Sequence, residues 1–428
     1  MHLPDRSRPD RALPLVTRSR CQRVEFFLAL GGVAAMGPAS MDMFFPALPA
    51  AARDLHVSPS AVMLTVTAYL VGITIGQAVG PLSDVVGRRR PLLVGVVLFT
   101  VASLACATAQ SIEVLAGARL VQGLAAAVGV VVSRAIIRDL YTGADVARHY
   151  STLIFIVGLS AVVSPTIGTR VLGLTSWRGV FVVLFGLGAV LLTVVVLRLP
   201  ESLPAARRRP GSVRATGRTY RGLVRDRRFI GYGVTLSCGT GALTALVTGS
   251  TFVVQDGFDA STQAFAFLFS AGAVAVVLMT VLNRRLLRSF SARRLLVAGL
   301  TTNAVGALAL LTVGRLSLLV YASCFIVIIA SWGLISANGT ASAVRDYAPV
   351  AGAALALVGI MQYTTGAIAA PLAGAVGDGT AVSVAIVVSC FSLVGLASVV
   401  LTVKGERRRT GAGRGVAVDA LREPLRVP

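Results

Sequence analysis

Two ionisable residues lie inside long apolar stretches of this 428-residue sequence: Asp42 within 24–48 and Arg119 within 114–133. A charged group at such a depth is unfavourable by roughly a few kcal/mol and marks a functional site by default. A buried carboxylate can take up and release a proton, and a nearby guanidinium can pair with it. We expect Asp42 and Arg119 to form a proton-coupling pair. The alternatives are a wetted carboxylate at the membrane surface and an arginine that bonds neighbouring helices.

The elements that position these two residues are membrane-spanning helices. With 55% hydrophobic and only 14% charged residues, the chain does not have the composition of a soluble protein. Apolar stretches of about 20 residues, the length needed to cross a bilayer, occur twelve times. They cover residues 24–48, 60–79, 92–110, 114–133, 149–172, 179–198, 229–254, 264–283, 295–313, 317–337, 349–376 and 380–403.

The basic residues predict how these helices are oriented. If both tails and every second loop lie on one side, that side holds 35 of the 40 lysines and arginines, and the opposite side holds four. Basic loops stay in the cytoplasm. We therefore predict an all-α, multi-pass protein of a bacterial cell membrane with both termini in the cytoplasm. The net charge of +22 then reflects membrane topology rather than nucleic-acid binding.

The predicted organisation is two six-helix bundles at residues 24–198 and 229–403, flanked by tails at 1–23 and 404–428. Between the bundles, 199–228 is rich in arginine and proline, which is typical of a solvated, partly disordered linker. The segment 283–296 occupies the same place in the second half as 80–93 in the first. Two pseudo-equivalent bundles with a binding site between them near mid-membrane are the architecture of a rocking transporter.

Metal, cofactor and enzyme chemistry have no matching pattern. The five cysteines are widely spaced and the three histidines are scattered, so we expect no metal site and no disulfide framework. A phosphate-binding loop needs a lysine, and the only lysine, Lys404, lies in the predicted tail. We expect no cofactor and no enzymatic activity, which leaves transport driven by an ion gradient as the main possibility.

The loop 80–93 carries the most specific motif. Gly80, Leu82, Ser83, Asp84, Gly87, Arg88 and Arg89 follow the order of the signature loop of the major facilitator superfamily, which the chain resembles. Glycines permit a tight turn between helices, and Asp84 can pair with arginines or cap a helix. The resemblance implies a conformational latch made of Gly80, Asp84, Gly87, Arg88 and Arg89. Val85 stands where the family has an arginine.

Three further segments extend the resemblance. Arg119–Gly123 is similar to the superfamily's arginine motif, and Ser164, Pro165 and Gly168 are similar to its antiporter motif. The stretch 41–49, which contains Asp42, resembles the corresponding segment of the Bcr/CflA drug:proton antiporters, in particular their chloramphenicol and florfenicol exporters. This resemblance implies export of a small amphipathic antibiotic in exchange for protons, by a protein that we expect to be a monomer.

Polar and aromatic residues within otherwise apolar helices are candidates for contact with a small, mostly apolar ligand. They are Tyr69, Gln77, Gln122, Trp332, Asn338, Gln362 and Tyr363. Hydrogen bonding between helices is the alternative role for each. At the level of the whole protein, the alternatives are a transporter of a nutrient or metabolite with the same fold, and a membrane receptor or scaffold that transports nothing.

Overall fold

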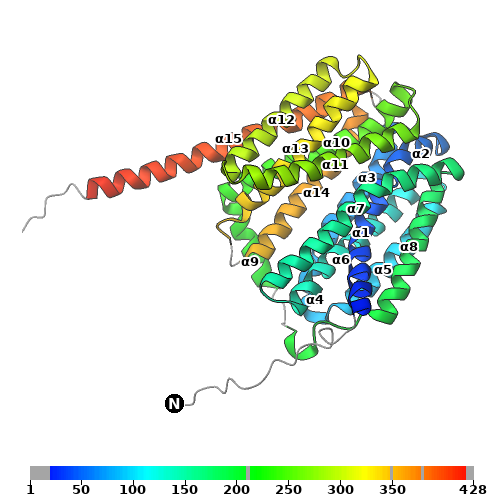
Figure 1. Ribbon diagram of the computed structural model, residues 1–428, viewed down its shortest axis with the longest axis horizontal. Coiled ribbons are helices and arrows are strands. Elements are labelled where there is room, and N and C mark those ends of the chain that lie inside the picture. Colours follow the sequence, from blue (N-terminus) through cyan, green and yellow to red (C-terminus); the bar gives the residue numbers. More distant parts are fainter. Residues whose placement is uncertain (1–19, 209–212, 348–349, 377–379, 421–428) are drawn as a thin grey trace, which may run out of the picture.

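The computed structural model describes residues 20–208, 213–347, 350–376 and 380–420. Within these residues all regular structure is helical, and twelve helical stretches are long and apolar enough to cross a membrane. They begin within three residues of the predicted starts and end within seven residues of the predicted ends, which confirms the twelve-helix prediction. Figure 1 shows them as two groups packed side by side, with α1 to α8 in one group and α10 to α15 in the other.

The first bundle begins with an interrupted span. Its first crossing is divided into α1, η1 and α2, because prolines at positions 46 and 49 favour a break there. The elements of this bundle are α1 (Arg20–Asp42), η1 (Phe45–Ala47), α2 (Leu48–Asp54), α3 (Pro59–Gly76), α4 (Val79–Val86), α5 (Arg89–Ala107), α6 (Ile112–Leu140), α7 (Ala144–Leu174) and α8 (Trp177–Arg198).

The second bundle repeats the pattern of six crossings. Its first helix, α10, ends in a π-helical turn, η3. The elements are α10 (Arg227–Phe252), η3 (Val253–Gly257), α11 (Thr262–Leu286), α12 (Ala292–Val313), α13 (Leu318–Val344), α14 (Ala351–Ala375) and α15 (Ala381–Ala420). Helix α15 continues through most of the segment that was predicted to be a tail, and residues 421–428 lie outside the described part.

The linker is more ordered than the sequence suggests. It contains a short 3₁₀ helix, η2 (Ala205–Arg207), and the helix α9 (Val213–Arg225). Leu199 and Leu203 are buried at its start and Leu223 is buried near its end. The prediction of a solvated, partly disordered linker is therefore wrong for these segments, because apolar side chains hold both ends of the linker against the bundles. Residues 209–212 are outside the described part.

Close approach of helices within a bundle depends on glycine. A Cβ atom at Gly72 of α3 would lie 2.0 Å from the Leu120 carbonyl oxygen of α6, and one at Gly123 would lie 2.0 Å from the Tyr69 carbonyl oxygen. Both distances are far below van der Waals contact, so these positions admit no side chain. The pair brings Tyr69 and Arg119 onto adjoining turns of two tightly packed helices.

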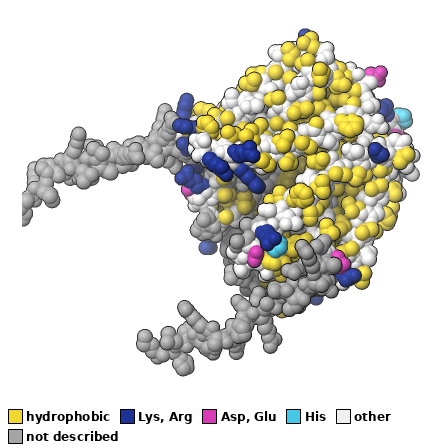
Figure 2. Space-filling view, viewed as in Figure 1, with side chains coloured by type: hydrophobic (Ala, Val, Ile, Leu, Met, Phe, Trp, Pro, Cys, Tyr) yellow, Lys and Arg dark blue, Asp and Glu magenta, His cyan; other side chains and the backbone are white. Residues whose placement is uncertain are grey.

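The outer surface of the bundles is largely apolar (Figure 2). Large hydrophobic side chains such as Leu174, Phe155 and Leu319 are exposed on helices of both bundles. Such an extent of exposed apolar surface suits contact with lipid and not with water. We call the end of the bundles where the arginine-rich loops gather the basic end, and the opposite end, where α2 and η3 lie, the far end.

Candidate functional site

Asp42 is the last residue of α1, at the point where the first span breaks. Helix α1 ends there and the chain passes through a turn at Met43 and Phe44 before η1 begins. The Asp42 side chain is 9% exposed, and no other acidic residue in the described part of the chain is buried. It forms no hydrogen bond or ion pair with any residue that the structure describes. A carboxylate in this position is free to take a proton or a new partner.

Helix α7 packs directly against this break through Gly168. A Cβ atom added at Gly168 would lie 2.3 Å from the Met43 carbonyl oxygen and 2.9 Å from the Met43 Cα atom. Ser164 and Pro165, one turn earlier, are also buried. The antiporter-like segment of α7 therefore lies against the residue that follows Asp42, a contact that the sequence alone did not predict.

Arg119 is completely buried between aromatic rings. Its Cζ atom lies 4.1 Å from the centre of the Tyr69 ring, 5.2 Å from that of Phe44 and 5.8 Å from that of Phe181. Nη1 donates hydrogen bonds to Gln122 Oε1 at 2.6 Å and to the Ser40 carbonyl oxygen at 3.3 Å. Cation–π contacts and these two bonds stabilise the charge in the absence of a carboxylate partner.

Asp42 and Arg119 are therefore neighbours through the backbone rather than an ion pair. Ser40, whose carbonyl accepts a bond from Arg119, stands two residues before Asp42 in the last turn of α1. The Nε and Nη2 atoms of Arg119 are buried without a hydrogen-bond partner in the described structure. The guanidinium thus keeps unused donors close to the helix break.

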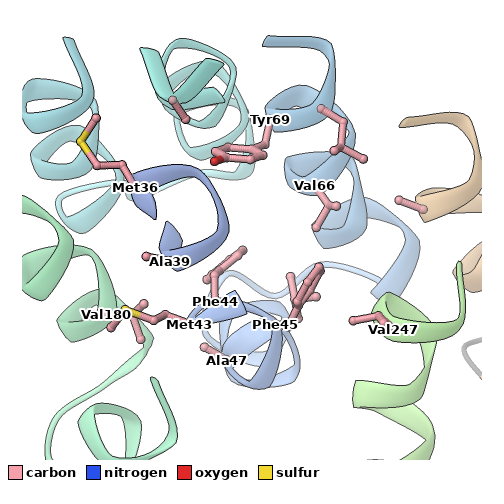
Figure 3. Close-up of a cluster of buried hydrophobic side chains, with 14 of the residues drawn as sticks. Met36, Ala39, Met43, Phe44, Phe45, Ala47, Val66, Tyr69, Val180 and Val247 are labelled. Atoms are coloured by element: carbon pink, nitrogen blue, oxygen red, sulfur yellow. The ribbon is translucent and has the colours of Figure 1, made fainter. Parts of the chain in front are cut away.

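The same break makes contact with the second bundle. The Phe45 carbonyl oxygen accepts a hydrogen bond from the Leu48 N–H of the 3₁₀ turn, and a carbonyl oxygen can accept a second one. Thr251 of α10 donates to the Phe45 oxygen at 2.9 Å, and Gln255 of η3 donates to the Pro46 oxygen at 3.1 Å. Figure 3 shows Phe44 and Phe45 projecting from the break, with Val247 of α10 facing them from the second bundle. These two acceptors join the segment after Asp42 to the opposite half of the protein.

Other contacts between the halves also lie toward the far end. Arg53 of α2 and Asp256 of η3 form an ion pair at 2.9 Å, with both side chains largely exposed. Deeper in the protein, Thr67 of α3 donates to the Ala367 carbonyl oxygen of α14 at 2.7 Å. In addition to the two hydrogen bonds at the break, the two halves are therefore joined by an ion pair at the far end and by a hydrogen bond deeper in the protein.

Three of the seven ligand-contact candidates are buried in this conformation. Tyr69 donates to the Gly37 carbonyl oxygen at 2.8 Å, Gln122 donates to Ser103 at 2.8 Å, and Asn338 donates to Asn283 at 2.8 Å. These bonds join helices within one bundle. The alternative role, hydrogen bonding between helices, is the one that these three residues have here.

The remaining four candidates are half-buried. Gln77 follows α3 and lies 4.0 Å from where a Cβ of Gly359 in α14 would be, so it is at the boundary between the halves. Gln362 of α14 donates to Thr240 of α10 at 3.1 Å, and Tyr363 is the next residue. Trp332 of α13 packs against Gly239 of α10. Gln77, Gln362 and Tyr363 thus come from the two helices that contact each other across the halves.

The loop 80–93 is an ion-pair network around Arg88, which is almost fully buried. Arg88 donates to Asp84 at 2.5 Å, to Asp139 at 2.7 Å and to Ser83 at 2.6 Å. Burial opposes the charge on Arg88, but its bonds to Asp139 and Asp84 outweigh that effect and hold the pKa of Arg88 above its ordinary value. The pairing predicted for Asp84 is confirmed.

The glycines of this loop differ in role. Gly87 has φ of 97° and makes the turn into α5, whereas Gly80 lies inside the short helix α4. The tight turn that the glycines of this loop permit is therefore made by Gly87, while α4 continues in helical geometry through Gly80 to Val86. Arg89 donates to the Leu199 and Val196 carbonyl oxygens at the end of α8. Every bond described for these loop residues stays within the first bundle and the start of the linker.

Glu201 of the linker makes contacts with the loop 80–93 that the sequence did not predict. Its carboxylate accepts hydrogen bonds from the backbone nitrogen atoms of Arg88 at 2.8 Å and Arg89 at 3.3 Å. It thereby caps the start of α5 and ties the linker to the loop. The available signal was one of only two acidic residues, Glu201 and Asp226, in an otherwise basic linker.

Comparisons with known proteins agree with this architecture. The Major Facilitator Superfamily profile matches residues 30–371. The chain is 36% identical to the uncharacterized MFS-type transporter YdgK of Bacillus subtilis, over 87% of this chain and 94% of that protein. It is 28% identical to a bicyclomycin resistance protein homolog of Haemophilus influenzae, over 83% of this chain and 90% of that protein.

A shorter match and a solved structure complete the comparison. A chloramphenicol resistance protein of Pseudomonas aeruginosa is 37% identical over 38% of this chain and 39% of its own length. The crystal structure of a D-xylose-proton symporter superposes with a TM-score of 0.70 and 16% identity, covering 90% of this chain and 97% of that one. The structural match concerns the fold alone.

A twelve-helix protein with two matched bundles of this kind is a membrane transporter and not an enzyme. The chain belongs to the Major Facilitator Superfamily, as a multi-pass protein of a bacterial inner membrane.

Proposed function

We propose that this protein is a proton-driven secondary transporter that exports small amphipathic antibiotics by alternating access and so confers drug resistance. Two of its relatives are named for resistance to bicyclomycin and to chloramphenicol. The observation that carries the proton-coupled part of the proposal is Asp42, a buried carboxylate without a partner, at the break of the first span.

The surroundings of Asp42 suit a group that changes its protonation state. A charged carboxylate in an apolar interior is strongly disfavoured unless it is paired, and Asp42 has no pair among the described residues. A proton arriving from outside neutralises it, and release of that proton lets the carboxylate attract the unused donors of Arg119. The protonated and the charged states of Asp42 therefore favour different conformations of the interrupted first span.

Alternating access requires that the two halves separate at one end at a time. With the basic end assigned to the cytoplasm by the distribution of arginines, the contacts Thr251–Phe45, Gln255–Pro46 and Arg53–Asp256 close the outer side. The protein is then in a state closed to the outside. Protonation of Asp42 changes the break three residues before Phe45 and so weakens the outer contacts.

The substrate site in this proposal lies between the halves. Gln77, Gln362 and Tyr363 supply amide and aromatic groups that remain half-buried there, and Trp332, which packs against Gly239 inside the second bundle, would become part of the site only if the helices shift. Such groups suit a ligand with an apolar ring and a few hydrogen-bonding groups. A phenicol such as chloramphenicol is the leading candidate, because one relative is named for resistance to it.

A susceptibility panel in a drug-sensitive host tests this function. Cells that express the protein are expected to tolerate at least fourfold more of a phenicol or of bicyclomycin than cells without it, and a protonophore is expected to remove the difference. Asp42→Asn is expected to abolish resistance at equal membrane abundance. Asp54→Asn is the matched control, because Asp54 is an exposed residue of the same span that pairs with Arg178.

Unchanged susceptibility across all antibiotic classes would favour transport of a metabolite or a role as a receptor. Full resistance in Asp42→Asn would remove Asp42 from the coupling mechanism while leaving drug export in place.

A further inference from the structure

The turn between α11 and α12 carries an unneutralised group of arginines. Arg284 and Arg285 end α11, Arg288 lies in the turn, and Arg294 is in the first turn of α12. All four are exposed, and none forms an ion pair with any residue in the described part of the chain. In Figure 2, Lys and Arg side chains gather over the neighbouring ends of α11 and α12.

The equivalent loop of the first bundle is built differently. There Arg88 is buried and satisfied by Asp84 and Asp139, and Arg89 bonds carbonyl groups of α8. In the second bundle, the buried polar residue at the start of the loop is Asn283, which accepts a hydrogen bond from Asn338 to form a neutral pair. Arg284, Arg285, Arg288 and Arg294 are therefore without an ion-pair partner among the residues that the structure describes.

The helical register places these arginines at the ends of lipid-facing stripes. Leu278, Val281 and Leu282 are exposed on α11, and Arg285 follows at helical spacing on the same face. The turn itself exposes Leu287 and Phe290, 43% and 46% accessible. Arginines beside exposed apolar side chains at the end of a span lie at the depth of lipid headgroups.

The stripe on α12 leads from Arg294 into a groove. The residues at positions 298, 301 and 305 are exposed one above another beyond Arg294. From Thr301 onward this face borders an apolar groove of about 390 Å³ between α12 and α13, and the groove includes Val305, Ala309, Cys324 and Val327. Thr301 lies seven residues beyond Arg294, about 10 Å along the helix, well within one leaflet of a bilayer whose core is about 30 Å thick.

We propose that this face of the second bundle is a binding site for an anionic phospholipid. The phosphate group lies among Arg285, Arg288 and Arg294, and one acyl chain follows α12 into the groove. The positive charge of the unpaired arginines favours a lipid headgroup with net negative charge over a zwitterionic headgroup. A lipid is favoured over a soluble anion because the exposed face of α12 runs without interruption from Arg294 to the apolar groove, where an acyl chain can bind. The site is independent of the transported substrate.

Lipid binding to the full-length purified protein tests this proposal. The protein in detergent is titrated with phosphatidylglycerol and separately with phosphatidylcholine, and bound lipid is counted by native mass spectrometry. Wild type is expected to bind phosphatidylglycerol more tightly. R285Q/R294Q, which removes one arginine from each stripe, is expected to weaken that binding roughly thirtyfold, about fivefold for each arginine, without changing phosphatidylcholine binding.

The matched control is R170Q/R315Q, which removes the same charge from exposed arginines at the far end; it is expected to leave phosphatidylglycerol binding within twofold of wild type. R284Q/R288Q repeats the test with a second pair should the first variant fold poorly. Equal weakening by the basic-end and far-end pairs, or no preference of wild type for phosphatidylglycerol, would overturn the proposal. Thr301→Phe, which places an aromatic ring in the part of the groove that lies within the same leaflet as Arg294, is expected to weaken phosphatidylglycerol binding; unchanged binding would remove the acyl-chain part.

Discussion

Replacing Thr251 by valine removes one of the two hydrogen bonds that join the two halves at the broken first span. Thr251 is completely buried and donates to the Phe45 carbonyl oxygen. Valine keeps the shape but removes this hydrogen bond, while the Phe45 oxygen still accepts from the Leu48 N–H. The loss is therefore that of one hydrogen bond, about 0.5–1.5 kcal/mol. The ratio of closed to open conformations at the far end should fall by roughly two- to twelvefold.

The ion pair at the same end should matter less. Arg53 and Asp256 are 65% and 48% exposed, and an exposed pair contributes about 0.2–1 kcal/mol. Arg53→Gln should therefore shift the same ratio by no more than about fivefold. The buried, neutral hydrogen bond is expected to hold the far end closed more strongly than the visible salt bridge.

Electron–electron distance measurements can separate these effects. Spin labels at positions 174 and 316, exposed on opposite halves at the far end, report separation in a background with all five cysteines replaced. We expect a longer-distance population in Thr251→Val that exceeds the one in Arg53→Gln, and a wild-type distribution in Thr251→Ser, which keeps the donor. A larger opening in Arg53→Gln than in Thr251→Val would refute the reasoning.

Three other substitutions probe the supports of the site. Gly168→Val should lower transport at least tenfold with the protein still in the membrane, because its side chain meets the Met43 backbone; Gly158→Val on the same helix, where nothing lies within 4 Å, should leave transport within twofold. Arg88→Gln strands the Asp139 carboxylate, so it should lower the free energy of unfolding by about 3–5 kcal/mol. Arg90→Gln, at an exposed position, should change it by less than about 0.5 kcal/mol, and an equal loss of thermal stability in both variants would contradict the assignment. Glu201→Ala should speed amide hydrogen exchange at positions 88 and 89, since it removes both acceptor oxygens; protection equal to wild type would show that the cap is unimportant.

The spans could be predicted because burial in lipid imposes a strong pattern on composition. The predicted helix ends are wrong where a helix extends beyond the apolar layer of the membrane. Helix α6 was expected to end at residue 133 but continues to Leu140, because Ile136 and Ile137 remain buried on one face while Arg134 and Arg138 are exposed. An amphipathic extension of this kind lowers mean hydropathy without ending the helix.

The candidate site was predictable only in part. Asp42 and Arg119 stand out because ionisable groups are rare inside spans, and the structure brings both to the break of the first span. The partners of that break, Thr251 and Gln255, are ordinary polar residues whose importance depends on how the halves dock. Likewise, Arg119 is stabilised by the rings of Tyr69, Phe44 and Phe181 instead of a carboxylate. These rings come from segments that are distant in the sequence, so no local sequence pattern predicts the arrangement.

The most direct test of proton-coupled export is a flux measurement in proteoliposomes. Purified protein is reconstituted with a pH-sensitive dye inside, and chloramphenicol movement is followed with and without an imposed pH difference. The account predicts that uphill drug movement requires the gradient, that drug and protons move in opposite directions, and that Asp42→Asn abolishes both movements while Asp54→Asn preserves them. Uphill drug movement in Asp42→Asn, or drug movement without any counterflow of protons in wild type, would contradict it.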